Sequence, residues 1–289
     1  QPVSGVLPVA ILCEERGARA LVLPSANAAE ASVVRGLTVI GATNLEEAQQ
    51  AMMADLCQKA AICDGESILD IGCGFGSFAI HALNAFPTSE VFGLTLSKVQ
   101  AEYIREKQAR PGHPLRSARF RLIEADFNAV QLGRRFDRIL SIGVFEHVSN
   151  LALALQKIGA MLAPGGKCLL HYIVYFPPLD RMATLPPEQN FMTGRIFPGG
   201  RIWFCDEVFN FQDDLKIEKS WFLNGSNYRK TVEFWTRNLE QNMNSIRRIP
   251  EISESALKTW ELFFRICVAV FALNRGRYYG NAQYLLTHP

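Results

Sequence analysis

The sequence predicts an α/β fold in which helices cover both faces of a mostly parallel sheet. Two observations lead to this prediction. Between residues 44 and about 175, short apolar segments typical of buried strands alternate with helical patterns, the order expected of βαβ units. The composition is that of a globular chain, because 48% of the 289 residues are hydrophobic and 20% are charged. This length suffices for one large domain with an appendage.

The N-terminal residues 1–43 form a separate small α/β segment in this prediction. We expect helices over 6–16 and 27–34 and strands over 20–23 and 37–40. Four such short elements are too few to close a hydrophobic core alone. The segment is therefore an appendage to a larger domain formed by residues 44–289.

Local patterns predict the elements of the larger domain. Asn44, with Glu47 three residues later, predicts the start of a helix that runs to Lys59. A glycine-rich turn after the first strand leads into a helix over 78–86, and a long amphipathic helix is expected near 255–273. The five expected strands cover residues 67–71, 90–94, 119–124, 135–142 and 167–174.

Charge and cysteine content exclude several classes of protein. Thirty basic and 28 acidic residues give a net charge of +2, so no nucleic-acid partner is expected. The seven cysteines have neither C-x-x-C nor metal-ligand spacing, so we expect no metal site, no disulfide framework and a cytoplasmic location. No apolar run approaches the roughly 20 residues that span a bilayer. Any membrane contact would be peripheral, at the inner membrane surface.

Residues 67–77 carry the clearest functional pattern, an apolar strand followed by a glycine-rich turn and a helix. The glycines let a ligand approach the backbone, and a helix N-terminus favours a carboxylate or phosphate. A dinucleotide site would need G-x-G-x-x-G and an acid ending the second strand. Here the third glycine comes one residue early and residues 93–97 read GLTLS. A purely structural turn and the donor loop of an S-adenosylmethionine-dependent methyltransferase both stay open.

Two aspartates are the other candidate residues of a donor site. Asp70 precedes the glycine turn, where it would orient the loop and the donor's ammonium group. Asp126 follows the third strand, where it would accept a hydrogen bond from the adenine amino group. Each has an alternative interpretation as a residue that merely caps a turn.

Five segments occur in the order and at the spacing of a known family: residues 68–76 (ILDIGCGFG), 93–100 (GLTLSKVQ), 141–148 (SIGVFEHV), 169–173 (LLHYI) and 196–200 (IFPGG). They resemble successive motifs of the cyclopropane fatty acid synthase family, which also includes mycolic acid cyclopropane synthases and coclaurine-type N-methyltransferases. The resemblance runs from about Asn44 to the C-terminus. It implies a class I, Rossmann-like methyltransferase fold with a central seven-stranded sheet, and S-adenosyl-L-methionine as methyl donor.

The resemblance assigns donor-binding roles to residues that follow the first, second and fourth strands. Ile142 would lie beside the transferring methyl group. Gly72, Gly74 and Gly76 would flank the methionine part of the donor, and Thr95, Leu96 and Gln100 would hold its ribose and adenine. The last three residues would explain why the second strand does not end in the acid of a dinucleotide site.

The resemblance also assigns residues to the acceptor. In cyclopropanating members a glutamate, a histidine and a tyrosine help to hold a bicarbonate that acts as base, and these match Glu146, His171 and Tyr228. Methyl transfer to an alkene creates a carbocation, which needs negative charge and a base close by. With an amine acceptor, Glu146 and His147 would instead deprotonate or orient the nitrogen. The alternatives are a hydrogen-bonded core histidine, a helix cap at Glu146-His147 and an ordinary packing tyrosine.

Two branches of the family fit the remaining motifs. Residues 171–173 and 197–200 look like the lipid branch, whereas 224–231 and 271–286 also resemble the N-methyltransferase branch. The latter usually has a glutamate where this chain has Gly143, which favours an unsaturated phospholipid over a small amine as acceptor. A donor-binding protein without turnover is the third hypothesis.

We expect an acceptor-binding insertion at about residues 176–235. Aromatic side chains there would line an apolar pocket, and basic side chains there and beyond it would meet lipid headgroups. The alternative is core aromatics beside a solvated charged face. The aromatic candidates include Trp203 and Phe209, and the basic ones are Arg229, Lys230, Arg247 and Arg248.

Residues 5–42 resemble a different protein class, a fragment of the N-terminal region of magnesium-chelatase-like AAA proteins without their ATPase part. They stand where the synthase family has helices that close over the donor and supply a cysteine. This chain has no counterpart of that cysteine motif, since Cys13 lies in the dissimilar segment. Residues 1–43 are therefore predicted to be foreign to the methyltransferase domain of residues 44–289.

Overall fold

The structure is a computed structural model that describes residues 20–24, 38–42, 45–176, 191, 194, 196, 200–250 and 252–289. Near the N-terminus, β1 (Ala20–Pro24) and β2 (Thr38–Ala42) pair in parallel, with Ala20 opposite Thr38. These are the two strands expected there, with ends that differ by at most two residues. The helices predicted over 6–16 and 27–34 lie outside the described residues.

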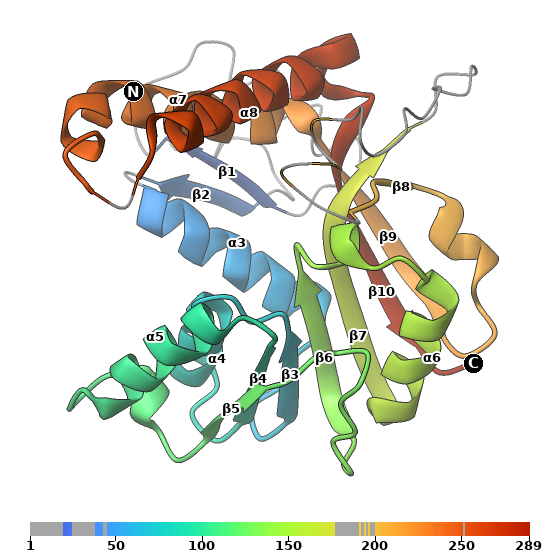
Figure 1. Cartoon of the computed structure of the whole chain (residues 1–289). Helices are drawn as coiled ribbons and strands as arrows, with labels where there is room; N and C mark the ends of the chain where they lie inside the picture. Colours follow the sequence, from blue (N-terminus) through green and yellow to red (C-terminus); the bar gives the residue numbers. More distant parts are fainter. Residues whose placement is uncertain are drawn as a thin grey trace.

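One mixed sheet forms the centre of the larger domain (Figure 1). Its strands are β3 (Ser67–Ile71), β4 (Glu90–Thr95), β5 (Phe120–Glu124), β6 (Phe136–Ile142), β7 (Leu162–Tyr175), β8 (Trp203–Phe204), β9 (Lys216–Asn224) and β10 (Tyr279–Thr287). Seven of them lie in the order β5-β4-β3-β6-β7-β10-β9, with β10 antiparallel to both neighbours, and the short β8 pairs with the end of β7. The expected mostly parallel seven-stranded sheet is confirmed, with β8 as an addition.

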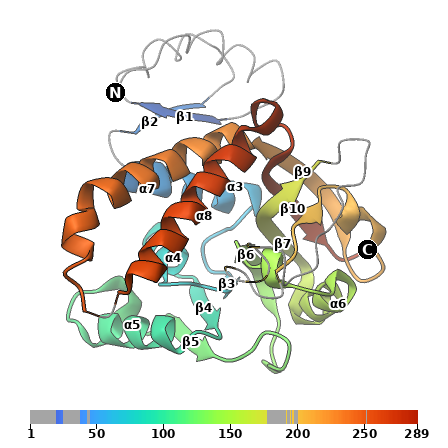
Figure 2. The ribbon, with the colours of Figure 1, turned by 45° about the horizontal axis from the view of Figure 1, so that its top comes forward.

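The helices cover both faces of the sheet and one of its ends (Figures 1 and 2). They are α3 (Leu45–Lys59), α4 (Ser77–Ala85), α5 (Lys98–Ala109), α6 (Leu151–Met161), α7 (Gly225–Ile246) and α8 (Glu254–Ala272). Buried residues of α3, α4 and α5 pack on one face, and those of α6 pack on the other. In Figure 1, α7 and α8 lie side by side above the carboxyl ends of β3 and β6.

The side chains that start the helices explain where they begin. Ser97, Asn150, Asn224 and Ser253 each accept a hydrogen bond from a backbone N–H two or three residues further on, and so cap α5, α6, α7 and α8. Helix α4 differs, because it begins after Gly76, which offers no side-chain cap. The first N–H groups of α4 are therefore available to a ligand.

Strand β7 is longer than the sequence predicts. The prediction starts at residue 167, whereas β7 starts at Leu162, directly after α6. The pair Gly165-Gly166 suggests a turn in the sequence, and Gly165 does have a left-handed φ of 75°. In the structure this pair lies in an irregularity of the ladder, where the pairing with β6 shifts register, so the strand continues through it.

Two hydrophobic cores lie on the two faces of the sheet. Leu69 and Ile71 of β3 point into the core that includes α6, whereas Ile68 points into the core that includes α3 and α4. Trp203 belongs to the first core, with 2% of its surface exposed and its indole N–H donating to the Phe145 carbonyl at 2.9 Å. The expectation that Trp203 lines an acceptor pocket is therefore wrong, because its side chain is used in packing.

Candidate active site

The predicted donor-binding residues meet at the carboxyl ends of neighbouring parallel strands. Asp70 lies on β3, Thr95 ends β4 and Ile142 ends β6. In sheet order, β4 and β5 lie on one side of β3 while β6 and β7 lie on the other. Such a reversal of strand order, here between β3 and β6, is the usual ligand position in parallel sheets.

The backbone of the glycine turn has conformations that favour glycine. Gly72, Gly74 and Gly76 have φ angles of 76°, 56° and 85°, in the left-handed region that side chains disfavour. A Cβ on Gly72 would stand 2.2 Å from Cγ2 of Val144, so this glycine lets the loops after β3 and β6 touch. A Cβ on Gly74 would meet no heavy atom within 4 Å. The turn thus presents bare backbone to open space, as a cradle for a ligand would.

Asp70 is a buried carboxylate beside this cradle. Only 2% of its surface is exposed, and no hydrogen bond to its side chain comes from the described residues. Burial raises the pKa of Asp70 to about 7. A ligand ammonium group is the partner that would return this carboxylate to its charged form, so the residue fits the amino group of S-adenosyl-L-methionine.

The loop after β4 is held by hydrogen bonds among the predicted ribose and adenine residues. Thr95 donates its Oγ1 hydrogen to Gln100 Oε1 at 2.7 Å and accepts from the Ser97 N–H at 3.1 Å. Thr95 is 3% exposed, whereas Leu96 is 68% exposed at the tip of the loop. The Gln100 amide nitrogen is left facing away from Thr95, which fits a donor to a hydroxyl-bearing ligand.

Asp126 has a structural task in addition to any ligand contact. Its Oδ1 accepts from the backbone N–H of Asn128 at 2.8 Å and from the Asn128 side chain at 3.2 Å. This is an Asx turn, the alternative interpretation of this residue. Only Oδ2 of Asp126 is then available for an adenine amino group.

Glu146 is positioned by a mismatch in strand length. Strand β6 ends at Ile142, opposite His171, while β7 continues to Tyr175. The side chain of Glu146 fills the position that β6 vacates, because its Oε1 accepts the Ile173 N–H at 2.7 Å. Its Oε2 is buried and has no hydrogen-bond partner in the described part of the chain. Burial raises the pKa of Glu146, although the bond from Ile173 opposes this.

His171 has partners that the sequence analysis missed. Its Nδ1 lies 3.0 Å from Gln283 Nε2 of β10, and Gln283 Oε1 accepts from Lys59 Nζ of α3 at 2.7 Å. Burial, and then the charge of Lys59, lower the pKa of His171 to about 4. The one signal in the sequence is a polar Gln283 inside an otherwise apolar strand pattern.

Tyr228 and His147 complete the set of predicted acceptor-side residues. Tyr228 of α7 packs on Phe271 of α8, with ring centroids 4.6 Å apart. Burial, and then Cys267 and Glu146, raise the pKa of Tyr228 to about 12, so its hydroxyl lies within electrostatic range of Glu146. His147 is exposed beside Glu146. The structure thus brings Glu146 and Tyr228 near one another, while the described hydrogen bonds of the His171 ring lead towards β10.

The glycine turn also carries a cysteine, Cys73. The described cysteines are all free, and burial, with a smaller effect of Asp70, raises the pKa of Cys73 in the glycine turn to about 12. Among the described residues, no three His, Cys, Asp or Glu side chains gather in a way that could hold a metal ion.

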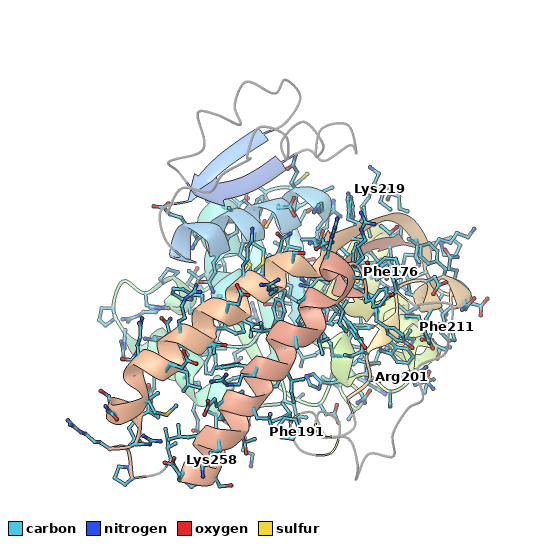
Figure 3. The ribbon with its side chains drawn as sticks, turned by 90° about the horizontal axis from the view of Figure 1, so that it is seen from above. Phe176, Phe191, Arg201, Phe211, Lys219 and Lys258 are labelled. Carbon is cyan, nitrogen blue, oxygen red and sulfur yellow. The ribbon has the colours of Figure 1, made fainter. Side chains whose placement is uncertain are left out.

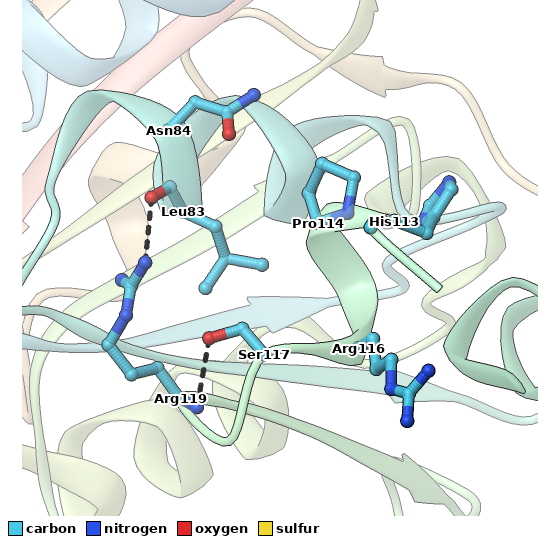
Figure 4. A pocket seen from close by; sticks show the side chains of 8 residues that line it. Leu83, Asn84, His113, Pro114, Arg116, Ser117 and Arg119 are labelled. Carbon is cyan, nitrogen blue, oxygen red and sulfur yellow. Dashed lines mark hydrogen bonds between the residues drawn. The ribbon is translucent and has the colours of Figure 1, made fainter. Parts of the chain in front are cut away.

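A separate pocket lies at the opposite ends of the strands (Figure 4). It is bordered by the end of α4 and by the segment that precedes β5. The Arg119 guanidinium there donates to the carbonyls of Leu83, Phe86 and Ser89, each at 3.0 Å. Because these bonds tie α4 to the neighbouring loop, we interpret the pocket as structural.

Comparison with known proteins identifies the family of the chain. The family model described as mycolic acid cyclopropane synthetase matches residues 41–278. The chain belongs to this family. The match begins at residue 41, so most of the N-terminal segment lies outside it.

Members of the family include enzymes with different acceptors. The probable (S)-tetrahydroprotoberberine N-methyltransferase 2 of Papaver bracteatum is 31% identical over 259 residues, 84% of this chain and 69% of that protein. A crystal structure of coclaurine N-methyltransferase, bound to N-methylheliamine and SAH, has a TM-score of 0.73 and 28% identity, covering 85% of this chain and 72% of that one. A mycolic acid cyclopropane synthase, complexed with SAH and CTAB, has a TM-score of 0.71 and 25% identity, covering 84% and 85%.

Family membership fixes three features of the chain. It has the class I methyltransferase fold, it is an S-adenosyl-L-methionine-dependent methyltransferase, and S-adenosyl-L-methionine is its cofactor. The open backbone at Gly74 and the buried Asp70 carboxylate fit that cofactor on independent structural grounds.

Proposed function

We propose that this methyltransferase acts on the double bond of an unsaturated acyl chain of a phospholipid. The observation that carries the proposal is the carboxylate of Glu146, which has one oxygen fixed by the Ile173 N–H and the other buried without a partner. A buried carboxylate oxygen without a donor is costly, and a bound water or ion is the usual way in which such an atom is satisfied. We infer that this oxygen meets a small polar ligand, a bicarbonate ion.

The residues around Glu146 suit a bicarbonate that works as a base. S-adenosyl-L-methionine supplies an electrophilic methyl group, and the methylated alkene then carries positive charge and must lose a proton. Burial raises the pKa of Glu146, so this carboxyl accepts a proton more readily than an exposed glutamate and repels a bound anion less. Tyr228, with its raised pKa, stays a hydroxyl donor. His171 would be a third group near the ion.

The exposed faces of α7 and α8 support a lipid acceptor. Large apolar side chains there are 36–49% exposed: Phe234, Trp235, Trp260 and Leu262. Lys258 extends from α8 on the same helical pair (Figure 3). Aromatic side chains beside basic ones are typical of proteins that rest on a membrane surface. None of the described helices is long and apolar enough to cross a bilayer, so this contact would be peripheral.

Two of the basic residues expected to meet headgroups have other partners. Arg229 pairs with Glu233 at 2.6 Å, and Arg247 pairs with Glu254 at 2.9 Å. Lys230 and Lys258 are therefore better candidates for a headgroup contact than these arginines. Of the acceptor-binding insertion expected at about residues 176–235, the part from 177 to 199 lies almost entirely outside the described residues.

Methylation of a small amine is the second candidate, and His147 is the observation that favours it. His147 is exposed directly beside Glu146, where the pair could orient or deprotonate an amine. A coclaurine N-methyltransferase is also among the similar structures. Gly143, however, has no side chain and a left-handed φ of 67°, so the second carboxylate of the N-methylating branch is lacking.

The experiment compares the two acceptors directly. The full chain is incubated with methyl-labelled S-adenosyl-L-methionine and either vesicles of unsaturated phospholipid or a panel of benzylisoquinoline amines, and products are identified by mass spectrometry. We expect a cyclopropane or methyl-branched acyl chain that requires added bicarbonate. Label found only in amines would refute the lipid proposal.

Two variants separate the mechanisms. Glu146→Gln retains an oxygen for the Ile173 N–H but loses the acid, so lipid methylation should fall about 10²–10⁴-fold. His147→Asn should leave lipid methylation unchanged and reduce transfer to an amine. Binding of S-adenosylhomocysteine, measured by calorimetry, should be the same in both variants and in the wild type.

The N-terminal segment calls for a separate proposal. We propose that residues 5–42 are a fragment of a magnesium-chelatase-like protein joined to the methyltransferase, supported by the start of the family match at residue 41. A protein that begins at residue 44 should then retain donor binding, and loss of folding in it would contradict the proposal.

A further inference from the structure

A continuous row of polar side chains connects α3 to the ring of His171 on one face of the sheet. Asp55 Oδ2 accepts from Lys59 Nζ at 2.6 Å, Lys59 Nζ donates to Gln283 Oε1 at 2.7 Å, and Gln283 Nε2 lies 3.0 Å from His171 Nδ1. Gln283 has no exposed surface, and His171 is 8% exposed. The row therefore ends inside the protein, where each bond has few competitors.

The chemistry of the groups fixes the direction of every bond in this row. A lysine ammonium only donates, so the Gln283 atom that faces Lys59 must be the carbonyl oxygen. The amide nitrogen of Gln283 then faces His171, and it also only donates. His171 Nδ1 must therefore accept, which requires a lone pair on that nitrogen. In the neutral ring the single proton then sits on Nε2.

The surrounding charges favour the neutral ring. Protonation would place an N–H on Nδ1 against the N–H of Gln283, so one bond of the row would be lost. Burial and the positive charge of Lys59 lower the pKa of His171 to about 4, and Asp55 opposes them only in part. Within the described chain, Lys59 and Asp55 of α3 are the charged groups that act on this ring.

We propose that Gln283, held in orientation by Lys59, is a positioning residue that keeps His171 as the neutral Nε2–H tautomer. His171 then presents a hydrogen-bond donor on the side of its ring away from Gln283, at neutral pH and below. It cannot act as a general base, because its one basic nitrogen is occupied. The proton released from the methylated substrate must leave through another group.

This role rests on the proposed function only in assuming that His171 faces the acceptor or its bicarbonate. The tautomer itself follows from the hydrogen bonds alone. An experiment that reads the tautomer directly therefore separates failure of this inference from failure of the proposed function.

The test is the ¹⁵N NMR spectrum of the histidine rings in the full chain, with His171 assigned from the signals lost in His171→Asn. In the wild type between pH 6 and 8, we expect a protonated Nε2 and an unprotonated Nδ1. In Gln283→Glu the carboxylate can only accept, so the proton should move to Nδ1 or the ring should become charged. Gln131→Glu makes the same change at an exposed position and should leave the spectrum unaltered.

Lys59 supplies the second pair of variants. Lys59→Met removes the donor that orients the amide, so both tautomers should appear, whereas Lys59→Arg keeps a donor and should restore the wild-type spectrum. A protonated Nδ1 in the wild type, or an unchanged ring in Gln283→Glu, would overturn the inference.

Turnover supplies the functional readout. The kcat of Gln283→Glu should fall about tenfold or more, the equivalent of one hydrogen bond in the transition state, with the affinity for S-adenosylhomocysteine unchanged. A switched tautomer with full turnover would also overturn the positioning role. If the wild type transfers methyl to no lipid, the proposed function fails while the spectrum still decides the tautomer.

Discussion

Asp70 offers the sharpest test of the donor site, because its burial makes a prediction about stability as well as binding. The perturbation is Asp70→Asn, which keeps the shape of the side chain and removes its charge. Burial raises the pKa of Asp70 from its ordinary value of 3.8 to about 7 in the folded protein. A difference of this size corresponds to at most about 4 kcal/mol of stability lost by burying the charged form.

The sign of the effect follows from the direction of the pKa change. A folded-state pKa above the unfolded value means that the folded protein binds more protons between pH 4 and 7, so the wild type loses stability as the pH rises through that range. Asp70→Asn escapes this loss. The buried asparagine amide would lack a partner, which costs about 1 kcal/mol or more. After this cost is subtracted, the free energy of unfolding of the variant should exceed that of the wild type by about 1–3 kcal/mol at pH 8, with no gain at pH 4.

Urea unfolding at pH 4, 6 and 8 measures this difference, and calorimetry with S-adenosylhomocysteine measures the cost to function. The variant should bind the ligand at least about a hundredfold more weakly, because the ammonium loses a buried charged partner. A stability difference that is the same at pH 4 and pH 8, or unchanged binding, would refute the reasoning.

Asp137→Asn is the matched control, since it makes the same substitution on the neighbouring strand β6. Burial raises the pKa of Asp137, but the N–H and hydroxyl of Ser67 and the charge of Arg138 lower it further, so the net pKa is below its ordinary value. This group stabilises the fold above pH 4 and ceases to do so as the pH falls. Asp137→Asn should therefore destabilise the protein at pH 8 and have less effect in acid, opposite to Asp70→Asn.

Three further outcomes are expected. Gly72→Ala should cost at least about 2 kcal/mol in urea unfolding, because the left-handed backbone disfavours a side chain and the new Cβ would stand 2.2 Å from a carbon of the next loop. Glu146→Ala should lower the free energy of unfolding by about 1–3 kcal/mol relative to Glu146→Gln, because alanine leaves the Ile173 N–H without an acceptor. Equal stabilities of the two variants would contradict this. At pH 8, Ellman's reagent should modify the exposed Cys63 at least about a hundredfold faster than Cys73, whose pKa burial and Asp70 raise to about 12.

The strand, turn and helix of the candidate donor site could be predicted because their signals are local. An apolar strand, an acid, three glycines and a helix occupy residues 67–85 without interruption, and each feature acts on its immediate neighbours. Such local patterns can be recognised in the sequence without knowing how the rest of the chain folds. The helices predicted at 44–59, 78–86 and 255–273 begin and end within one residue of α3, α4 and α8 for the same reason.

The acceptor half depends on contacts between distant parts of the chain. Gln283 lies 112 residues from His171 and 224 residues from Lys59 in sequence, and only the insertion of β10 beside β7 brings them together. The local pattern of residues 279–287 predicts a strand but does not indicate which other strand it will pair with. The partners of His171, unlike the glycines of the donor loop, therefore follow from topology and not from any motif.

The unequal lengths of β6 and β7 bring the donor and acceptor parts of the candidate site next to each other. Because β6 stops at Ile142, the Gly143 N–H still reaches the His171 carbonyl, but the next free N–H of β7, that of Ile173, must find a side chain. The carboxylate of Glu146 satisfies that N–H, and the same bond fixes the position of its second oxygen. Backbone pairing thus helps to place an acid beside the end of the glycine turn, together with the Arg201 N–H that donates to the Glu146 carbonyl at 2.7 Å. A change that lengthened β6 by two residues would pair Ile173 with backbone and release Glu146, so the position of this carboxylate depends on the early end of β6.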